Sequence, residues 1–188
     1  NLVDPDWVTK IRQGRQDEIK PCIRCHNGCF NFAKFKGTAN IQSTQDSLHL
    51  GRCALNPTTM QHNKYKIVPT KSPKKVAIIG AGIGGLMAAE YLKARGHNPT
   101  VYEATDAPGG HFVLAGKAPK KQAFTDAVMW DAEECKRMGI EIKTGVTVTP
   151  ELIKEVKPDH VIVATGAHFV KPNTVSYTHL RAHETGAY

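Results

Sequence analysis

Short apolar runs alternate with longer amphipathic segments in the second half of the chain. Residues 74–79 are short and rich in β-branched side chains, which is typical of a buried strand, and a strand is also expected at 160–164. Residues 84–95 and 121–138 have helical spacing of apolar positions, and each is followed by a helix-ending glycine. Further strands are expected at 100–103, 140–143 and 146–148, and a further helix at 150–156. Strands that alternate with helices predict an α/β fold with a parallel sheet.

The first 73 residues have a different pattern. Asp4 can cap a helix that Pro5 starts and Pro21 stops, with Trp7, Ile11 and Ile19 as candidate buried positions. The residues that follow are rich in loop-forming types and then polar with little periodicity. We therefore expect four parts: a helical segment at 1–21, a cysteine-containing segment at 22–57, a linker at 58–73 and an α/β domain at 74–174.

Composition and charge exclude several classes of protein. The 188 residues are 40% hydrophobic and 22% charged, as in ordinary globular proteins. The net charge of +8 is spread over scattered lysines instead of one stripe, so no nucleic-acid site is expected. No segment approaches the roughly 18 apolar residues of a membrane span. Five cysteines without an export signal favour a reducing compartment, and we expect a cytoplasmic protein.

The last residues do not continue the α/β pattern. Residues 175–185 agree, position by position, with the translation of a transposon-end adaptor used in sequencing libraries. We therefore interpret 175–188 as non-native read-through, together with the metal-like spacing of His179 and His183. Because the chain also starts without Met, we expect it to be an internal piece of a longer protein.

A glycine-rich loop follows the first predicted strand. Gly80, Gly82 and Gly85 fit G-x-G-x-x-G between a strand and a helix, the arrangement that binds a dinucleotide pyrophosphate. The backbone N–H groups and the helix dipole then hold the phosphates. Glu103 ends the second strand, where a carboxylate can accept hydrogen bonds from a ribose 2′-OH and disfavours a 2′-phosphate.

Two more glycine patterns extend this site. A double glycine follows Glu103, and the last strand ends in Ala-Thr-Gly. The combination resembles the flavoproteins with two dinucleotide domains, whose first pocket binds FAD and whose second, inserted domain binds NAD(P)H. The expected cofactor-binding residues are Gly80, Gly82, Gly84, Gly85, Glu103, Gly109, Gly110, Thr165 and Gly166.

Four cysteines precede the glycine loop with the spacing C-x2-C-x3-C-x23-C. Cys22, Cys25, Cys29 and Cys53 are the expected metal ligands, and a [4Fe–4S] cluster suits the tight first triplet. A four-cysteine zinc site usually has two C-x2-C pairs, whereas this chain has one. Zinc and plain structural cysteines stay open as alternatives, and Cys135 is expected to be part of the core.

Residues 4–173 resemble the old-yellow-enzyme-related NADH:flavin oxidoreductases of the 2,4-dienoyl-CoA reductase, 2-enoate reductase and trimethylamine dehydrogenase type. The resemblance lies in the four cysteines, the flavoprotein glycine patterns and these residues: Asp4, Pro5, Lys10, Gly14, Arg15, Asp17, Glu18, Ile19, Pro21, Ile23, Gly28, Asn56 and Pro57. The long insert at 30–52 is more similar to the enoate reductase branch than to the dienoyl-CoA reductases.

The resemblance implies a fold and an electron path. The fold would be an incomplete Rossmann-like FAD-binding domain, preceded by a helix and an iron–sulfur loop from the end of a TIM barrel. Electrons would pass from NAD(P)H through FAD and the [4Fe–4S] cluster to FMN, for reduction of an activated C=C bond in a small unsaturated carbonyl or acyl-CoA compound. The barrel with FMN and the NAD(P)H domain would lie outside this chain, so it holds no expected catalytic residue and would be inactive alone.

Two other functions are compatible with the residues. A glutamate-synthase-like electron-input subunit also places cysteines before an FAD domain, usually in Cys-Pro runs that this chain lacks. A zinc-stabilised, non-enzymatic binding module is the other alternative. The substrate and the choice between NADH and NADPH are not encoded in recognisable residues, and an oligomer is compatible with the sequence.

Overall fold

The computed structural model describes residues 2–29 and 51–167 and contains a four-stranded parallel sheet. The strand order is β3-β2-β1-β4, so β1 pairs with both β2 and β4. The strands are β1 (Lys75–Ile79), β2 (Asn98–Tyr102), β3 (Glu141–Lys143) and β4 (His160–Val163). β1 is central and covered, which explains its continuous apolar run. The predicted α/β fold with a parallel sheet is confirmed.

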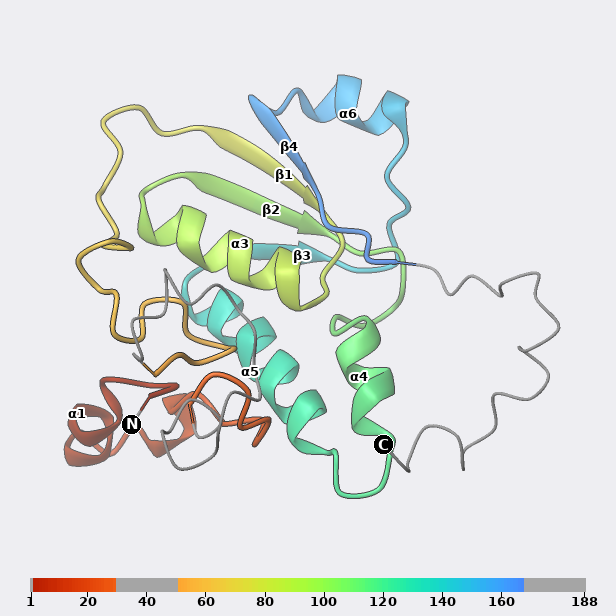
Figure 1. Ribbon diagram of the computed structural model, residues 1–188. Coiled ribbons are helices and arrows are strands. Elements are labelled where there is room, and N and C mark those ends of the chain that lie inside the picture. The colour runs from red at the N-terminus through yellow and green to blue at the C-terminus, as the bar shows by residue number, and fades with distance from the viewer. Residues whose placement is uncertain (1, 30–50, 168–188) are drawn as a thin grey trace, which may run out of the picture.

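Helices lie on both sides of the sheet. Figure 1 shows α3 (Ile83–Ala94) and α5 (Ala123–Arg137) on one side and α6 (Pro150–Val156) on the other, near β4. α6 begins where the Thr149 hydroxyl accepts a hydrogen bond of 3.3 Å from the Leu152 N–H. A short helix, α4 (His111–Gly116), follows β2 and was not expected from the sequence.

The described residues have two apolar clusters. The larger one lies between the sheet and helices α3 and α5, and its buried members are Val76, Ile78, Ala81, Leu86, Ala89, Val101, Val128, Ala132, Cys135 and Ile140. The smaller one consists of Val3, Ile23, Leu55 and Ala127, and Cys53 packs against it. Because Ala127 belongs to α5, the smaller cluster fastens the N-terminal part and the cysteine segment to the α/β domain.

The N-terminal part differs from its prediction. It contains α1 (Trp7–Arg12) and a single 3₁₀ turn at Gln16–Glu18. Asp4 does not cap α1, because its carboxylate accepts hydrogen bonds from the Asp6 and Lys20 N–H groups and from Lys10 Nζ. The burial expected for Ile11 is wrong, since its side chain is 43% exposed and α1 turns Lys10 toward the body of the protein instead.

One expected strand is absent from the described part of the chain. Residues 146–148 have no strand structure there, although the Val146 N–H donates to the Glu103 carbonyl at 2.8 Å. Val146 and Val148 line a cavity at the sheet edge instead of extending the sheet. In the described ranges, no helix has the length and apolar character needed to cross a membrane. The proposed adaptor residues 175–188 and most of the 30–52 insert lie outside those ranges.

Candidate dinucleotide and cysteine sites

The glycine loop between β1 and α3 is shaped by close backbone packing. Gly80 has a φ of +108°, and a Cβ there would overlap the Ala164 carbonyl at the end of β4. A Cβ on Gly85 would overlap the Gly80 carbonyl oxygen. These two glycines are therefore required by the protein itself, which lets the strand and helix approach each other.

The other two glycines of the loop face open space. A Cβ built on Gly82 or Gly84 would meet no protein atom within 4 Å, and both residues line a cavity of about 850 Å³. Gly82 is also the N-cap residue of α3, so the free N–H groups of that helix start at this cavity. The volume is within the range of small-molecule and cofactor sites. A backbone without side chains at a helix start is what a pyrophosphate needs.

The double glycine docks α4 onto the first loop. The Gly109 N–H donates to the Ala81 carbonyl at 2.8 Å, and Gly110, with a φ of +51°, is the N-cap of α4. His111 and Phe112 of that helix line the cavity, although sequence reasoning had not selected them. The double glycine just before the apolar residues 112–114 was the available signal for this short helix.

The structure brings nearly all of the predicted cofactor residues together. Eight of them line the 850 Å³ cavity, namely Gly80, Gly82, Gly84, Glu103, Gly109, Gly110, Thr165 and Gly166. Gly85 does not line it, because it packs behind the loop against Gly80. This packing role is the one that its place in the fingerprint predicts.

Glu103 is held by the loops around it. Its carboxylate accepts hydrogen bonds from the Ala81 N–H at 2.7 Å and from the N–H and hydroxyl of Thr105 at 2.9 and 2.8 Å. Burial alone would raise the pKa of Glu103, but these hydrogen bonds stabilise the charged form and lower it below the ordinary value. The carboxylate is therefore ionised at neutral pH and lines the cavity, where a ligand hydroxyl can donate to it alongside the backbone N–H groups.

The four predicted metal ligands line a second, smaller cavity of about 30 Å³. Cys22 and Cys25 are exposed, whereas Cys29 and Cys53 are half-buried. The Arg24 N–H donates to the Cys22 sulfur at 3.4 Å, and Arg24 has a left-handed φ of 56°. Four thiols around one cavity are the donor set of a [4Fe–4S] cluster.

A close backbone contact brings the fourth cysteine to the first three. The Arg52 N–H donates to the Gly28 carbonyl at 2.5 Å, and a Cβ on Gly28 would lie 2.8 Å from the Arg52 Cβ. Burial, together with the nearby Cys22 and Cys25, raises the pKa of the Cys53 thiol. Within residues 2–29 and 51–167, no group of three or more His, Cys, Asp or Glu side chains is arranged to hold a single metal ion.

Cys135 stands apart from this site, as predicted. It is fully buried in the larger apolar cluster, its Sγ lies 3.6 Å from the Leu86 carbonyl, and burial raises its pKa to about 12. The dinucleotide cavity and the cysteine cavity are connected by shared apolar contacts. Ile83 and Phe112, which line the large cavity, contact both apolar clusters, and Cys53 packs against the smaller one.

Comparisons with known proteins agree with this arrangement. A family model described as an NAD(P)-binding Rossmann-like domain matches residues 78–113. The NADH oxidase of Thermoanaerobacter brockii is 36% identical over 174 residues, which are 91% of this chain and 25% of that protein. The cinnamate reductase of Clostridium sporogenes is 31% identical over 166 residues, covering 88% of this chain and 23% of that protein.

A solved structure extends the likeness to both candidate sites. The 2-naphthoyl-CoA reductase in complex with 2-naphthoyl-CoA superimposes with a TM-score of 0.80 at 26% identity, over 95% of this chain and 26% of that one. The chain belongs to the old-yellow-enzyme-related NADH:flavin oxidoreductases. It spans about a quarter of the length of the family members that it matches.

Proposed function

We propose that this chain is the part of an NAD(P)H-dependent iron–sulfur flavoprotein that holds FAD and a [4Fe–4S] cluster. The observation that carries the proposal is that four cysteines line one small cavity and a dinucleotide-type glycine loop lines a larger one in the same packed unit. Such neighbouring sites are what an electron-transferring protein needs.

The residues present fit both groups. Cys22, Cys25, Cys29 and Cys53 would bind the cluster through their thiolates. Gly82 and Gly84 leave room for the pyrophosphate of FAD, and Glu103 offers an acceptor to its ribose. When bound, FAD exchanges electron pairs with NAD(P)H, and the cluster carries single electrons.

For the whole protein, we propose reduction of an activated C=C bond in a small enoate or enoyl-CoA compound. The names of two matched proteins, a cinnamate reductase and a 2-naphthoyl-CoA reductase, support this class of substrate. The name of the matched NADH oxidase supports NADH as the electron donor. No described residue is assigned to the chemical step, which would take place on FMN in another part of the protein.

The test is the metal, sulfide and flavin content of the 188-residue chain after anaerobic reconstitution. We expect iron and acid-labile sulfide in about a 1:1 ratio, near four of each per chain, and one FAD. Cys25→Ser should remove most of the iron and leave FAD bound. The matched control is Cys135→Ala, which removes the cysteine outside the site and should keep the iron.

Other outcomes would change the conclusion. About one zinc per chain without sulfide would show that the cysteines form a structural zinc site, and it would contradict the electron-transfer proposal. Iron that is unchanged in Cys25→Ser would show that the four thiols do not form the site. Binding of NAD in place of FAD by the glycine loop would contradict the cofactor assignment but not the cluster.

A further inference from the structure

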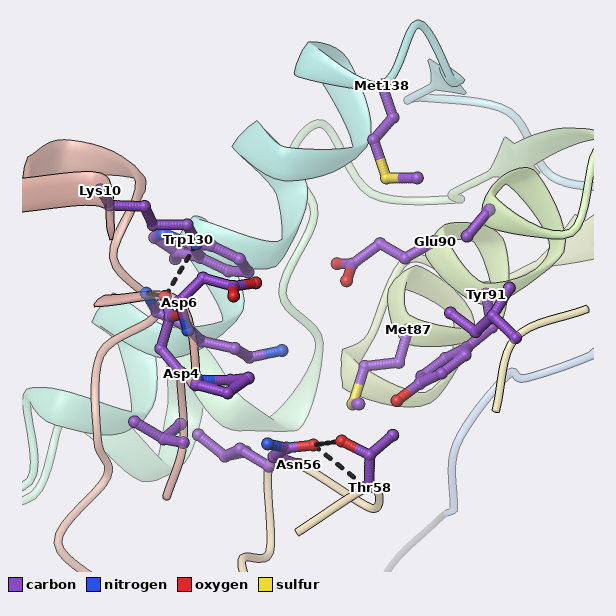
Figure 2. Close-up of a pocket in the computed structure, with 16 residues that line it drawn as sticks. Asp4, Asp6, Lys10, Asn56, Thr58, Met87, Glu90, Tyr91, Trp130 and Met138 are labelled. Atoms are coloured by element: carbon purple, nitrogen blue, oxygen red, sulfur yellow. Dashed lines mark hydrogen bonds and ion pairs between the residues drawn. The ribbon is translucent and has the colours of Figure 1, made fainter. Parts of the chain in front are cut away.

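A third cavity lies on the opposite side of α3 and α5 from the sheet. It has a volume of about 290 Å³, opens to solvent, and is lined by the N-terminal part, the segment after Cys53, α3 and α5 (Figure 2). It shares no lining residue with the dinucleotide cavity. Its apolar walls are formed by Leu55, Ile67, Met87, Tyr91, Trp130 and Met138. It shares Val3 and Leu55 with the cysteine cavity but is lined by none of the four cysteines, so it is a third space beside the two cofactor sites proposed above.

Two lysines of this cavity are already engaged by carboxylates. Lys10 Nζ lies 2.8 Å from Asp4 Oδ2 and donates to the Glu18 carbonyl, also at 2.8 Å. Lys20 Nζ lies 2.6 Å from Asp131 Oδ1, with both side chains almost completely buried. Buried charges of this kind need close partners. The Lys10 and Lys20 charges are thus balanced before any ligand is considered.

Glu90 is a carboxyl of the cavity that forms no ion pair with Lys10 or Lys20. Figure 2 shows its carboxyl directed from α3 into the space between α3 and Trp130. Its Oε1 is buried and accepts no hydrogen bond from a described donor, and its carboxyl lies close enough to Asp131 for the two to share a proton. The charged groups that face Glu90 are Lys20 from the N-terminal part and Asp131 and Glu134 from α5. Glu134 is paired with Arg137 at 2.7 Å, so Lys20 is a single ammonium beside two carboxyls.

When Glu90 is ionised, Lys20 is the single positive charge beside two carboxylates, and a second positive charge would balance them. We propose that the cavity binds a small organic ammonium ion, which donates to the Glu90 carboxylate and places its hydrocarbon part against Met87, Tyr91 and Trp130. Aromatic and thioether side chains around one carboxylate are suited to such amphiphilic cations. A volume of about 290 Å³ suits an ammonium ion with a short hydrocarbon part.

Binding is coupled to release of a proton. Burial and the Asp131 charge raise the pKa of Glu90 to about 8, so the free cavity holds a proton on this carboxyl at neutral pH. The ammonium replaces that proton: the carboxylic acid loses H⁺ to solvent, and the resulting carboxylate pairs with the bound cation. The affinity should therefore rise as the pH rises through the pKa of Glu90.

The experiment is calorimetric titration of the 188-residue chain with n-pentylammonium chloride, with 1-pentanol as the uncharged probe. We expect saturable binding of the ammonium that is at least about 10-fold tighter at about pH 9 than at about pH 6. About one proton should be released per ligand at neutral pH. Glu90→Gln should lose this binding, whereas Glu155→Gln, on exposed α6, should keep it.

A second variant tests the proposal independently, in case Glu90→Gln does not fold. Ile67→Lys adds a positive charge at the partly exposed rim of the cavity and should weaken binding without entering the core. Equal affinity in Glu90→Gln, or equal binding of pentanol, would overturn the proposal. So would a Glu90 carboxyl that titrates in NMR without any saturable ammonium binding, because the cavity would then take up a proton alone.

Discussion

The glycine loop and the cysteine segment are built in different ways. The loop is fixed by neighbouring elements of a regular fold, because β1, α3 and β4 meet at Gly80 and Gly85 with no room for side chains. The described residues of the cysteine segment, 22–29 and 51–57, contain no helix or strand, and two of its four thiols are exposed. The regular fold thus forms the candidate dinucleotide site, whereas the candidate cysteine site depends on a few local contacts and on the proposed cluster.

The largest expected effect comes from adding a single methyl group behind the glycine loop. Gly85→Ala would place its Cβ against the Gly80 carbonyl, and we expect a loss of about 3 kcal/mol or more in unfolding free energy. Urea unfolding followed by circular dichroism would measure it. Gly84→Ala is the matched control, since it faces open space in the same helix and should be neutral or slightly stabilising.

A methyl group at Gly82 distinguishes the packing role of the loop from its role in ligand binding. Gly82→Ala meets no protein atom and should leave the unfolding transition unchanged, while its FAD content falls. If Gly82→Ala unfolded as easily as Gly85→Ala, the division of the loop into packing glycines and ligand-facing glycines would be wrong.

The cysteine segment offers a parallel test. Gly28→Ala would force its Cβ against Arg52 and separate Cys53 from the first three cysteines, at a local cost of about 2 kcal/mol. We expect most of the iron to be lost while the α/β domain unfolds as before. Gly51→Ala is the control, because a Cβ there meets nothing within 4 Å. Iron content that is equal in both variants would show that the contact between Gly28 and Arg52 does not position the fourth cysteine.

Between the two regions, Glu90 makes stability depend on pH. Its pKa is raised from 4.5 to about 8 by burial and by Asp131, so the folded protein binds this proton more tightly than the unfolded chain does. Stability should therefore fall as the pH rises from about 4.5 to about 8. Glu90→Gln should be more stable than the wild type at about pH 9 by roughly 2 kcal/mol and similar to it at about pH 4.

The control for this pH dependence is Glu133→Gln on the exposed face of α5. Its partner is Lys136, with both side chains at least half exposed, so little change is expected at either pH. Because Glu90 and Asp131 share Lys20, the measured transition belongs to the carboxyl pair. A wild-type stability that stays level between these pH values would contradict a protonated Glu90.

The sequence predicted best where one physical signal dominates. The apolar run of β1 and the helical spacing of α5 follow directly from burial on a sheet, and their positions agree to within one or two residues. The glycine loop was recognisable because close packing leaves no alternative residue at Gly80 or Gly85. That the four cysteines share one site was expected from their spacing and from the glycine loop that follows them, and the four line one cavity.

What the sequence did not predict depends on contacts between distant parts of the chain. Asp4 is a residue type that often caps helices. Here its carboxylate instead accepts a hydrogen bond from the backbone N–H of Lys20, sixteen positions later. Ile11 fits a buried helical position, but α1 has only one and a half turns and presents Lys10 to Trp130 instead. α4 is too short for its periodicity to be visible. The charge imbalance at Glu90 required the three-dimensional neighbours of α3.

The smallest expected effect concerns Glu103, which connects the glycine loop to the turn after β2. Glu103→Gln keeps the shape but replaces a charged acceptor of the Ala81 and Thr105 N–H groups, and we expect a loss of about 1 kcal/mol at neutral pH. Its pKa is lowered in the folded protein, so the contribution is complete above about pH 4.5 and disappears as the pH falls through the folded-state pKa. The difference between wild type and variant should therefore shrink in acid.

Glu141→Gln provides the comparison, since this exposed carboxylate lies 3.5 Å from Lys143 on β3 and should change stability by less than about 0.5 kcal/mol. If Glu103→Gln matched it at neutral pH and still lost FAD, Glu103 would serve the ligand alone. If it lost both stability and FAD, the carboxylate would hold the loop in shape before the ribose arrives. The second outcome is the one that agrees with a dinucleotide site formed by the fold, because the three hydrogen bonds to Glu103 exist without any ligand.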